Sequence, residues 1–156
     1  MAKFIYRMQN ILDIKYKLEE QAKQQYMIVR MRLNEAEEAL EKLENRKEGY
    51  FKEYRILLSE RLDIIEIENC KNSIILMDEY ILNQKNVIRG IEQELLQAEN
   101  ALKEAMQERK IHEKLRENQL EVFLQELNKE EMKEIDQLVS YRYNNVESEE
   151  EIDYGK

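Results

Sequence analysis

The side chains of this chain that could carry out chemistry are mostly carboxylates, with one cysteine and one histidine. Thirty-four of the 156 residues are Asp or Glu, and paired carboxylates, thiolates and imidazoles are the usual acids, bases and nucleophiles of enzymes. Here the carboxylates alternate with lysines along helix-forming segments, a pattern typical of a solvated helix surface. His112 has no second metal ligand at helical spacing, and we expect it at the surface or at the edge of a helix contact.

Cys70 has two interpretations, a small buried hydrophobe or a reactive thiol, and its apolar neighbours at helical spacing favour the first. The sequence contains no paired cysteines, no histidine pair and no glycine-rich phosphate loop. We therefore predict no catalytic, metal or cofactor-binding residues, and we do not expect an enzyme.

Two runs of residues follow the spacing of a coiled coil. The helices that they predict must position any residues with which this chain binds a partner. In each run, apolar or long-stemmed residues recur at alternating steps of three and four, which keeps one narrow stripe facing a partner helix. The first run is Val29, Leu33, Ala36, Leu40, Leu43, Lys47, Tyr50, Tyr54 and Leu57. The second is Ile67, Cys70, Ile74, Met77, Ile81, Gln84, Ile88, Ile91, Leu95, Ala98, Leu102 and Ala105.

Each stripe needs a second helix to cover it, and the nearest candidate is the other run of the same chain. The predicted fold is therefore all-α, a long antiparallel two-helix coiled coil, or helical hairpin. The alternative is a structural coiled-coil scaffold or tether, for which a parallel dimer would be the natural state. The relative direction of the paired helices distinguishes the antiparallel hairpin from the parallel dimer.

The predicted hairpin domain covers residues 1–142, with helix one at about 3–58, a turn at 59–63 and helix two at about 64–141. Asp63 and Glu66 have the spacing of a capping box at the start of helix two. Residues 143–156 are acidic, and we expect a disordered tail. The first helix has an early stripe offset by one residue from the later one, which predicts a locally loosened supercoil. That early stripe is Phe4, Met8, Ile11, Lys15, Leu18 and Ala22.

With the turn near residue 61, antiparallel pairing joins residues whose numbers add up to roughly 122 to 124. Leu57 then meets Ile67, Val29 meets Leu95, and Phe4 comes near Leu120. Helix two outruns helix one, and its overhang from about residue 121 to 141 keeps an apolar stripe that includes Phe123, Leu124 and Leu127. We expect this overhang to bind a partner, with self-association as the alternative.

The amino-acid composition limits the kinds of partner that this chain is expected to bind and the cellular compartment in which it is expected. A net charge of −9 argues against nucleic acid, because phosphate neutralisation needs a basic face. With 38% charged residues and a mean hydropathy of −0.80, the chain has too little apolar side chain for a compact core. The sequence shows neither a signal-peptide profile nor an apolar run long enough to span a membrane, so we expect a cytoplasmic protein.

Three segments together resemble the FliJ family of flagellar type III export proteins. They are KFIYRMQNILDIKYKLEEQAKQQY at the start, DIIEIENCKNSIILMDEYIL after the turn, and ERKIHEKLRENQLEVFLQELNKEEMKEIDQLVSYRY near the end. The resemblance covers residues 3–143. It implies a non-enzymatic component of the flagellar export apparatus, similar to the central stalk of rotary ATP synthases and peripherally associated with the basal body at the inner membrane.

The resemblance also implies partners. Family members bind the hexameric export ATPase and promote its assembly, contact the cytoplasmic domain of the export gate protein FlhA, and have been described as chaperones or chaperone escorts. The matched gate positions are Leu43, Tyr50, Met77 and Gln84. This chain departs from the family at Ser73, where an aromatic residue is expected, and at Arg46, where a tyrosine is expected. The overhang residues Phe123, Leu124 and Leu127 are the expected ATPase contacts.

Tyrosines near the turn, at positions 50, 54 and 80, combine apolar area with a polar tip. They can be interface residues or bulky fillers of the stripe. Both interpretations stay open at this point.

Overall fold

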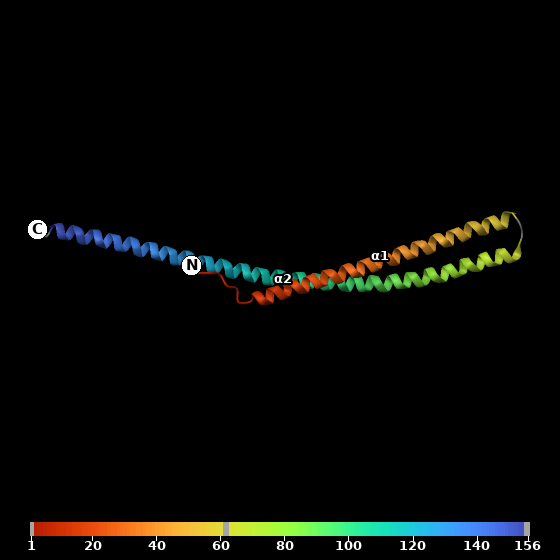
Figure 1. The fold of residues 1–156 in the computed structure, drawn as a ribbon, viewed down its shortest axis with the longest axis horizontal. Coiled ribbons are helices and arrows are strands. Elements are labelled where there is room, and N and C mark those ends of the chain that lie inside the picture. Colours follow the sequence, from red (N-terminus) through yellow and green to blue (C-terminus); the bar gives the residue numbers. More distant parts are fainter. Residues whose placement is uncertain (1, 61–62, 155–156) are drawn as a thin grey trace. The chain divides into compact units, whose positions relative to one another are not determined.

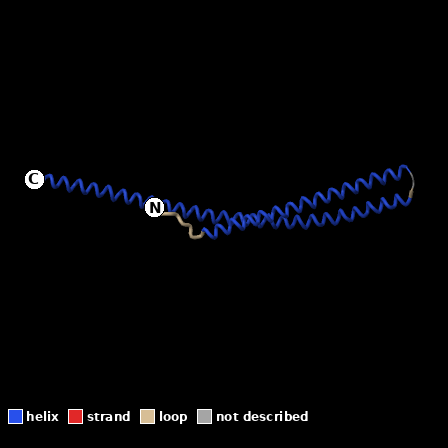
Figure 2. Tube along the Cα trace, in the orientation of Figure 1, coloured by secondary structure: helices blue, strands red, loops and turns tan. Residues whose placement is uncertain are grey.

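The fold consists of two long helices that run in opposite directions. The computed structural model describes residues 2–60 and 63–154, without the side chains of residues 149–154. Helix α1 spans Gln9–Glu60 and helix α2 spans Ile64–Tyr154. Figure 1 shows the chain following α1 to the turn and returning along α2, and Figure 2 shows that little of the described chain lies outside these helices. The predicted all-α antiparallel hairpin is confirmed.

The chain divides into two units. Tyr16–Gln107 form one, here called the hairpin unit, and Met1–Lys15 with Glu108–Lys156 form the other, here called the terminal unit. Each is described by itself.

Local chemistry explains where α2 begins. Asp63 lies just before the helix, and its Oδ1 accepts a hydrogen bond from the Ile65 amide at 3.2 Å. The Asp63 carbonyl accepts another from the Ile67 amide at 3.0 Å. The Asp63 side chain therefore caps the free Ile65 amide of the first turn, and α2 begins at the residue that the capping pattern indicated. Of the expected turn, residues 61 and 62 lie outside the described residues.

The core of the hairpin unit is the predicted coiled-coil stripe. Every residue of the two predicted runs is buried or half-buried. One cluster at its centre joins both helices, with Tyr26, Leu40 and Leu95 packed against it. Its buried members are Val29, Leu33, Ala36, Ile88, Ile91 and Ala98.

Polar contacts between the two helices of this unit fix the pairing. The Cys70 Sγ donates to the Tyr50 carbonyl oxygen at 3.2 Å, and the Gln84 Nε2 donates to the Ala36 carbonyl oxygen at 2.9 Å. The Arg32 guanidinium pairs with Glu94 at 2.7 Å, and Lys47 pairs with Asp78. In these four pairs the residue numbers add up to about 120 to 126, a range that brackets the predicted value. Val29 and Leu95 share the central cluster, as antiparallel pairing requires.

The early stripe of α1 differs from the prediction. Met8, Ile11 and Leu18 are exposed, at 38%, 38% and 45%. Lys15 and Ala22 are half-buried as predicted, and Leu12 and Glu19 are buried in place of Ile11 and Leu18. The stripe thus runs through Leu12, Lys15, Glu19, Ala22 and Tyr26. Their spacing continues the later stripe without a break, so the offset and the loosened supercoil are not needed.

Both outer limits of the helices also differ from the prediction. Helix α1 begins at Gln9 instead of about residue 3. Residues 2–6 are not helical, and residues 7–8 form a turn. Helix α2 continues to Tyr154, through most of the segment for which disorder was expected. Proline is absent from the chain and no glycine lies between Gly90 and residue 155, so nothing in that stretch interrupts the helix.

Candidate partner-binding surfaces

The four expected gate residues all lie in the stripe that joins the helices of the hairpin unit. Leu43, Tyr50 and Gln84 are half-buried, and Met77 is only 5% exposed. The Gln84 amide is held by its bond to the Ala36 carbonyl. These residues therefore stabilise the hairpin, and only their partly exposed atoms can touch a partner.

Exposed apolar side chains lie beside that stripe. Tyr80 is 46% exposed, Leu76 is 44% exposed and Phe51 is 41% exposed, with the Lys47 ammonium 5.9 Å from the Phe51 ring centre. Tyr80 was singled out from the sequence, but Leu76 and Phe51 were missed. The spacing of Leu76 and Tyr80, four residues apart on one helix face, is the signal that could have found Leu76.

Two of the tyrosines near the turn face inward more than outward. Tyr50 and Tyr54 are half-buried in the stripe, whereas Tyr80 is exposed. The filler interpretation therefore applies to Tyr50 and Tyr54.

The two positions that depart from the family differ in burial. Ser73 is half-buried, and its hydroxyl donates to the Asn69 carbonyl at 3.0 Å, whereas Arg46 is exposed.

Cys70 is a buried member of the stripe at 7% exposure, as the favoured interpretation predicted. Burial raises the pKa of its thiol above the ordinary 9.0, and the negative charge of Glu53 raises it further. Because the thiolate is the reactive form, this environment favours an inert side chain.

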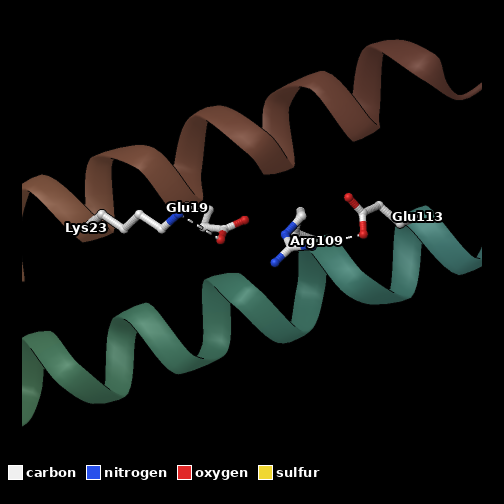
Figure 3. A network of polar contacts seen from close by, with 4 residues as sticks. All are labelled: Glu19, Lys23, Arg109 and Glu113. Atoms are coloured by element: carbon white, nitrogen blue, oxygen red, sulfur yellow. Dashed lines mark hydrogen bonds and ion pairs between the residues drawn. The ribbon is translucent and has the colours of Figure 1, made fainter.

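The first part of α1 carries charge inside its stripe. Glu19 is 5% exposed and pairs with Lys23 at 3.4 Å, one turn further along the same helix. Figure 3 shows this pair on α1 and the Arg109–Glu113 pair, 2.9 Å apart, on α2. A buried carboxylate is tolerated when its charge is paired. The apolar Ile11, Ile14 and Leu18 of the same segment are left exposed.

In the terminal unit, the residues before α1 pack on α2. The Phe4 and Phe123 rings lie 5.5 Å apart at 52°, and the Arg116 guanidinium is 5.7 Å from the centre of the Phe4 ring. Arg116 also donates from Nε to the Gln9 Oε1 at 3.1 Å. Phe4 was predicted near Leu120, about one turn away from the contact that forms.

This packing changes the interpretation of the expected ATPase residues. Leu124 is 49% exposed, but Phe123 and Leu127 are half-buried. The prediction that helix α1 is too short to cover them is correct for the helix, but the non-helical segment before it reaches Phe123. The overhang therefore becomes fully exposed only after Leu127.

A second polar cluster of the terminal unit includes the histidine. Glu108 lies 3.4 Å from the Lys15 ammonium and 3.9 Å from the His112 Nε2. The His112 side chain is 16% exposed, which fits the expected position at the edge of the helix contact. No group of three His, Cys, Asp or Glu side chains that could hold a metal ion occurs in the described part of the chain.

A cavity of about 670 Å³ lies where the segment before α1 meets α2. Its apolar walls are formed by Phe4, Ile5, Val122 and Phe123. The basic side chains of Lys3 and Arg7 and the acidic side chain of Glu126 also line it. An apolar surface with a charged rim is typical of a site for a partner's side chains. It was not visible in the sequence, because the segment before α1 was expected to be helical.

Beyond this cavity, α2 is bare. Every side chain from residue 128 to residue 148 is exposed, including the apolar Met132, Ile135, Leu138 and Val139. Among residues 2–60 and 63–154, no helix is long and apolar enough to cross a membrane.

The two paired helices and the bare end of α2 place this chain among the coiled-coil hairpin proteins. Within that class the chain belongs to the flagellar FliJ protein family, whose model matches residues 4–148. The family resemblance inferred from the three sequence segments is thus confirmed. The family is a non-catalytic component of the flagellar export system. No curated protein and no solved structure matches the chain.

Proposed function

We propose that this chain is a stalk-like cytoplasmic component of flagellar export that binds the hexameric export ATPase, promotes its assembly and contacts the export gate protein FlhA. The observation that carries the proposal is the bare extension of α2 beyond a paired hairpin. A helix with exposed apolar residues and no covering partner is suited to insertion into another protein.

The orientation of the helices favours this proposal over a scaffold or tether. A parallel dimer was the expected state of a scaffold, and the chain instead pairs with itself in an antiparallel hairpin. The stripe of the hairpin unit is therefore already occupied within one molecule. What remains for partners is the exposed surface.

The ATPase contact is proposed at Phe123, Leu124 and Leu127. Leu124 supplies exposed apolar area, and Phe123 lines the cavity beside Phe4. The three residues lie where the paired region gives way to the bare helix.

The gate contact is proposed at Leu43, Tyr50, Met77 and Gln84, through the atoms of these residues that the stripe leaves accessible. Exposed Leu76 and Tyr80 lie next to them along α2 and would enlarge the contact. Export chaperones are further proposed partners. The proposed location is peripheral to the inner membrane, through the gate alone.

Changing Phe123, Leu124 and Leu127 together to serine tests the ATPase contact. Burying such side chains contributes about 1.5–3 kcal/mol each, so the triple variant is expected to abolish stimulation of ATP hydrolysis while circular dichroism shows nearly unchanged helical content. Leu124→Ser alone removes exposed apolar area without breaking the Phe4–Phe123 contact, and should weaken stimulation less severely.

A matched control changes three exposed apolar residues of the hairpin unit to serine, namely Leu82, Val87 and Leu96. This control should stimulate the ATPase normally. If the Phe123, Leu124 and Leu127 variant stimulates ATP hydrolysis as well as the unmodified chain does, the proposed contact is wrong.

A further inference from the structure

The segment before α1, residues 2–8, covers part of one proposed ATPase contact. Figure 2 shows it in tan, outside the helices. Its Phe4 ring packs on the Phe123 ring of α2, with 5.5 Å between the ring centres, and the Arg116 guanidinium lies 5.7 Å from the centre of the Phe4 ring. Residues 2–8, here called the strap, are therefore an internal ligand for a site on α2.

The strap buries a polar group at a cost. Tyr6 is 6% exposed, and its hydroxyl has no hydrogen-bond partner within the described part of the chain. A buried hydroxyl without a partner gives up its hydrogen bonds to water and gains none, which destabilises the arrangement that buries it. Burial of the Tyr6 hydroxyl therefore works against a closed strap, whereas the ring contact of Phe4 favours it.

The sequence offers the strap a second conformation. Phe4, Met8 and Ile11 are spaced four and three residues apart, so a helix that began at residue 3 would place them on one face. Residues 2–8 contain no proline or glycine that would oppose such a helix. Met8 and Ile11 are each 38% exposed in the structure. An open strap could thus pack Phe4 beside them, away from Phe123.

We propose that the strap opens and closes, and that the closed strap inhibits the chain by occupying the part of the ATPase contact around Phe123. In the open form, Phe123 and Arg116 accept an apolar or aromatic side chain of the partner in place of Phe4. A partner that binds only the open form draws the equilibrium toward it. The inference rests on the proposed function in naming the export ATPase as that partner. It adds a regulation of the same contact by the chain itself.

Two single variants of the full chain test the regulation through their affinity for purified export ATPase. Phe4→Ala removes the ring that closes the strap, and we expect about 3- to 10-fold tighter binding, because loss of an aromatic contact raises the minor open population by about that factor. Tyr6→Phe keeps the ring and removes the unpartnered hydroxyl. Its strap should close more firmly, so we expect binding to weaken by about 3-fold or more.

Ile5→Ala is the matched control, because Ile5 is the strap residue next to Phe4 and is 79% exposed. It should bind within about 2-fold of the unmodified chain. The opposite directions expected for Phe4→Ala and Tyr6→Phe distinguish a regulating strap from an ordinary part of the contact. A Phe4→Ala variant that binds equally or more weakly, or a Tyr6→Phe variant that does not bind more weakly, would overturn the proposal.

Acetylation of tyrosine hydroxyls by N-acetylimidazole measures opening of the strap without the ATPase. The reagent modifies hydroxyls that reach solvent, so the rate at Tyr6, resolved by peptide mass spectrometry, follows the open population. Tyr143, at 66% exposure, gives the reference rate. Tyr6 should react more slowly than Tyr143 in the unmodified chain, about 3- to 10-fold faster after Phe4→Ala, and at an unchanged rate after Ile5→Ala. A Tyr6 rate that ignores Phe4→Ala would overturn the strap.

The two measurements separate failure of the inference from failure of the proposed function. Absence of ATPase binding in every variant would refute the proposed function, and with it the partner named for the strap, while the Tyr6 rates still decide whether the strap opens. Equal ATPase affinities in variants whose Tyr6 rates differ would overturn the regulation and leave the proposed function standing.

Discussion

Cys70 illustrates how one side chain serves the hairpin. Its thiol is buried in the stripe and donates to the Tyr50 carbonyl on the facing helix. Burial and the nearby Glu53 raise its pKa. The folded chain thus favours the neutral thiol over the thiolate.

We expect this shift to appear in chemistry and in stability. Because the folded pKa lies above the unfolded value, the stabilisation is complete below about pH 9 and is lost as pH rises through the folded pKa. The free energy of unfolding of the unmodified chain, measured against Cys70→Ala by urea titration, should therefore fall in alkaline solution. Iodoacetamide should modify Cys70 more slowly in the folded than in the unfolded chain, and equal rates would refute the buried, protonated thiol.

Gln84 raises a different question, because it is both a proposed gate contact and a link between helices. Gln84→Ala removes the bond to the Ala36 carbonyl, which should lower stability by about 1 kcal/mol. If Gln84 also contacts FlhA, affinity for the FlhA cytoplasmic domain should fall further than the change in melting temperature explains. Tyr50→Ala should behave likewise.

Gln93→Ala is the matched control for that comparison, because Gln93 is an exposed glutamine of the same helix. It should change neither melting nor gate affinity, and ATPase stimulation should persist in all three variants. Gate affinity that declines only in step with melting temperature would show that Gln84 and Tyr50 are packing residues and no more.

At the scale of elements, spacing predicted the hairpin unit well because its stripe is almost entirely apolar. The rule selects apolar residues at steps of three and four, and from Val29 to Ala105 the residues at those positions are buried or half-buried. It failed in part at the start of α1, where Lys15 was placed correctly but Leu12 and Glu19 occupy the stripe and Ile11 and Leu18 lie outside it. Lys15 pairs with Glu108 on α2, and the buried Glu19 pairs with Lys23 on the same helix. A rule that selects apolar residues does not find a buried carboxylate.

The segment before α1 escaped prediction for a similar reason. Its residues are compatible with a helix, but the contact of Phe4 with Phe123 forms from a non-helical segment. Such a choice depends on tertiary packing, which overrides weak local preference. The ATPase contact at Phe123, Leu124 and Leu127 stays a prediction, and the partial coverage of these residues could not be predicted from the sequence.

The Phe4–Phe123 contact can be measured by a double-mutant cycle. Phe4→Ala, Phe123→Ala and the double variant should show a coupling of about 0.5–1.5 kcal/mol in the free energy of unfolding, as expected for an aromatic pair. Strictly additive effects would mean that the two rings do not stabilise each other. Phe4→Ala should also uncover Phe123, and so leave the proposed ATPase surface more exposed.

At the scale of the whole molecule, we propose that one chain, folded back on itself, serves as the stalk that activates the export ATPase. Val29 is 2% exposed and packs in the same cluster as Leu95. A disulfide between these positions would lock the hairpin without touching the bare part of α2. Such a disulfide distinguishes a hairpin formed by one chain from a scaffold formed by two chains.

The most direct test replaces Cys70 with alanine, introduces Val29→Cys and Leu95→Cys, and measures ATP hydrolysis by the export ATPase after oxidation. The account predicts crosslinks within single chains, and predicts that the crosslinked monomer, isolated by gel filtration, stimulates hydrolysis as strongly as the reduced chain does. Crosslinks that join two chains only, or a crosslinked monomer that no longer stimulates the ATPase, would contradict it.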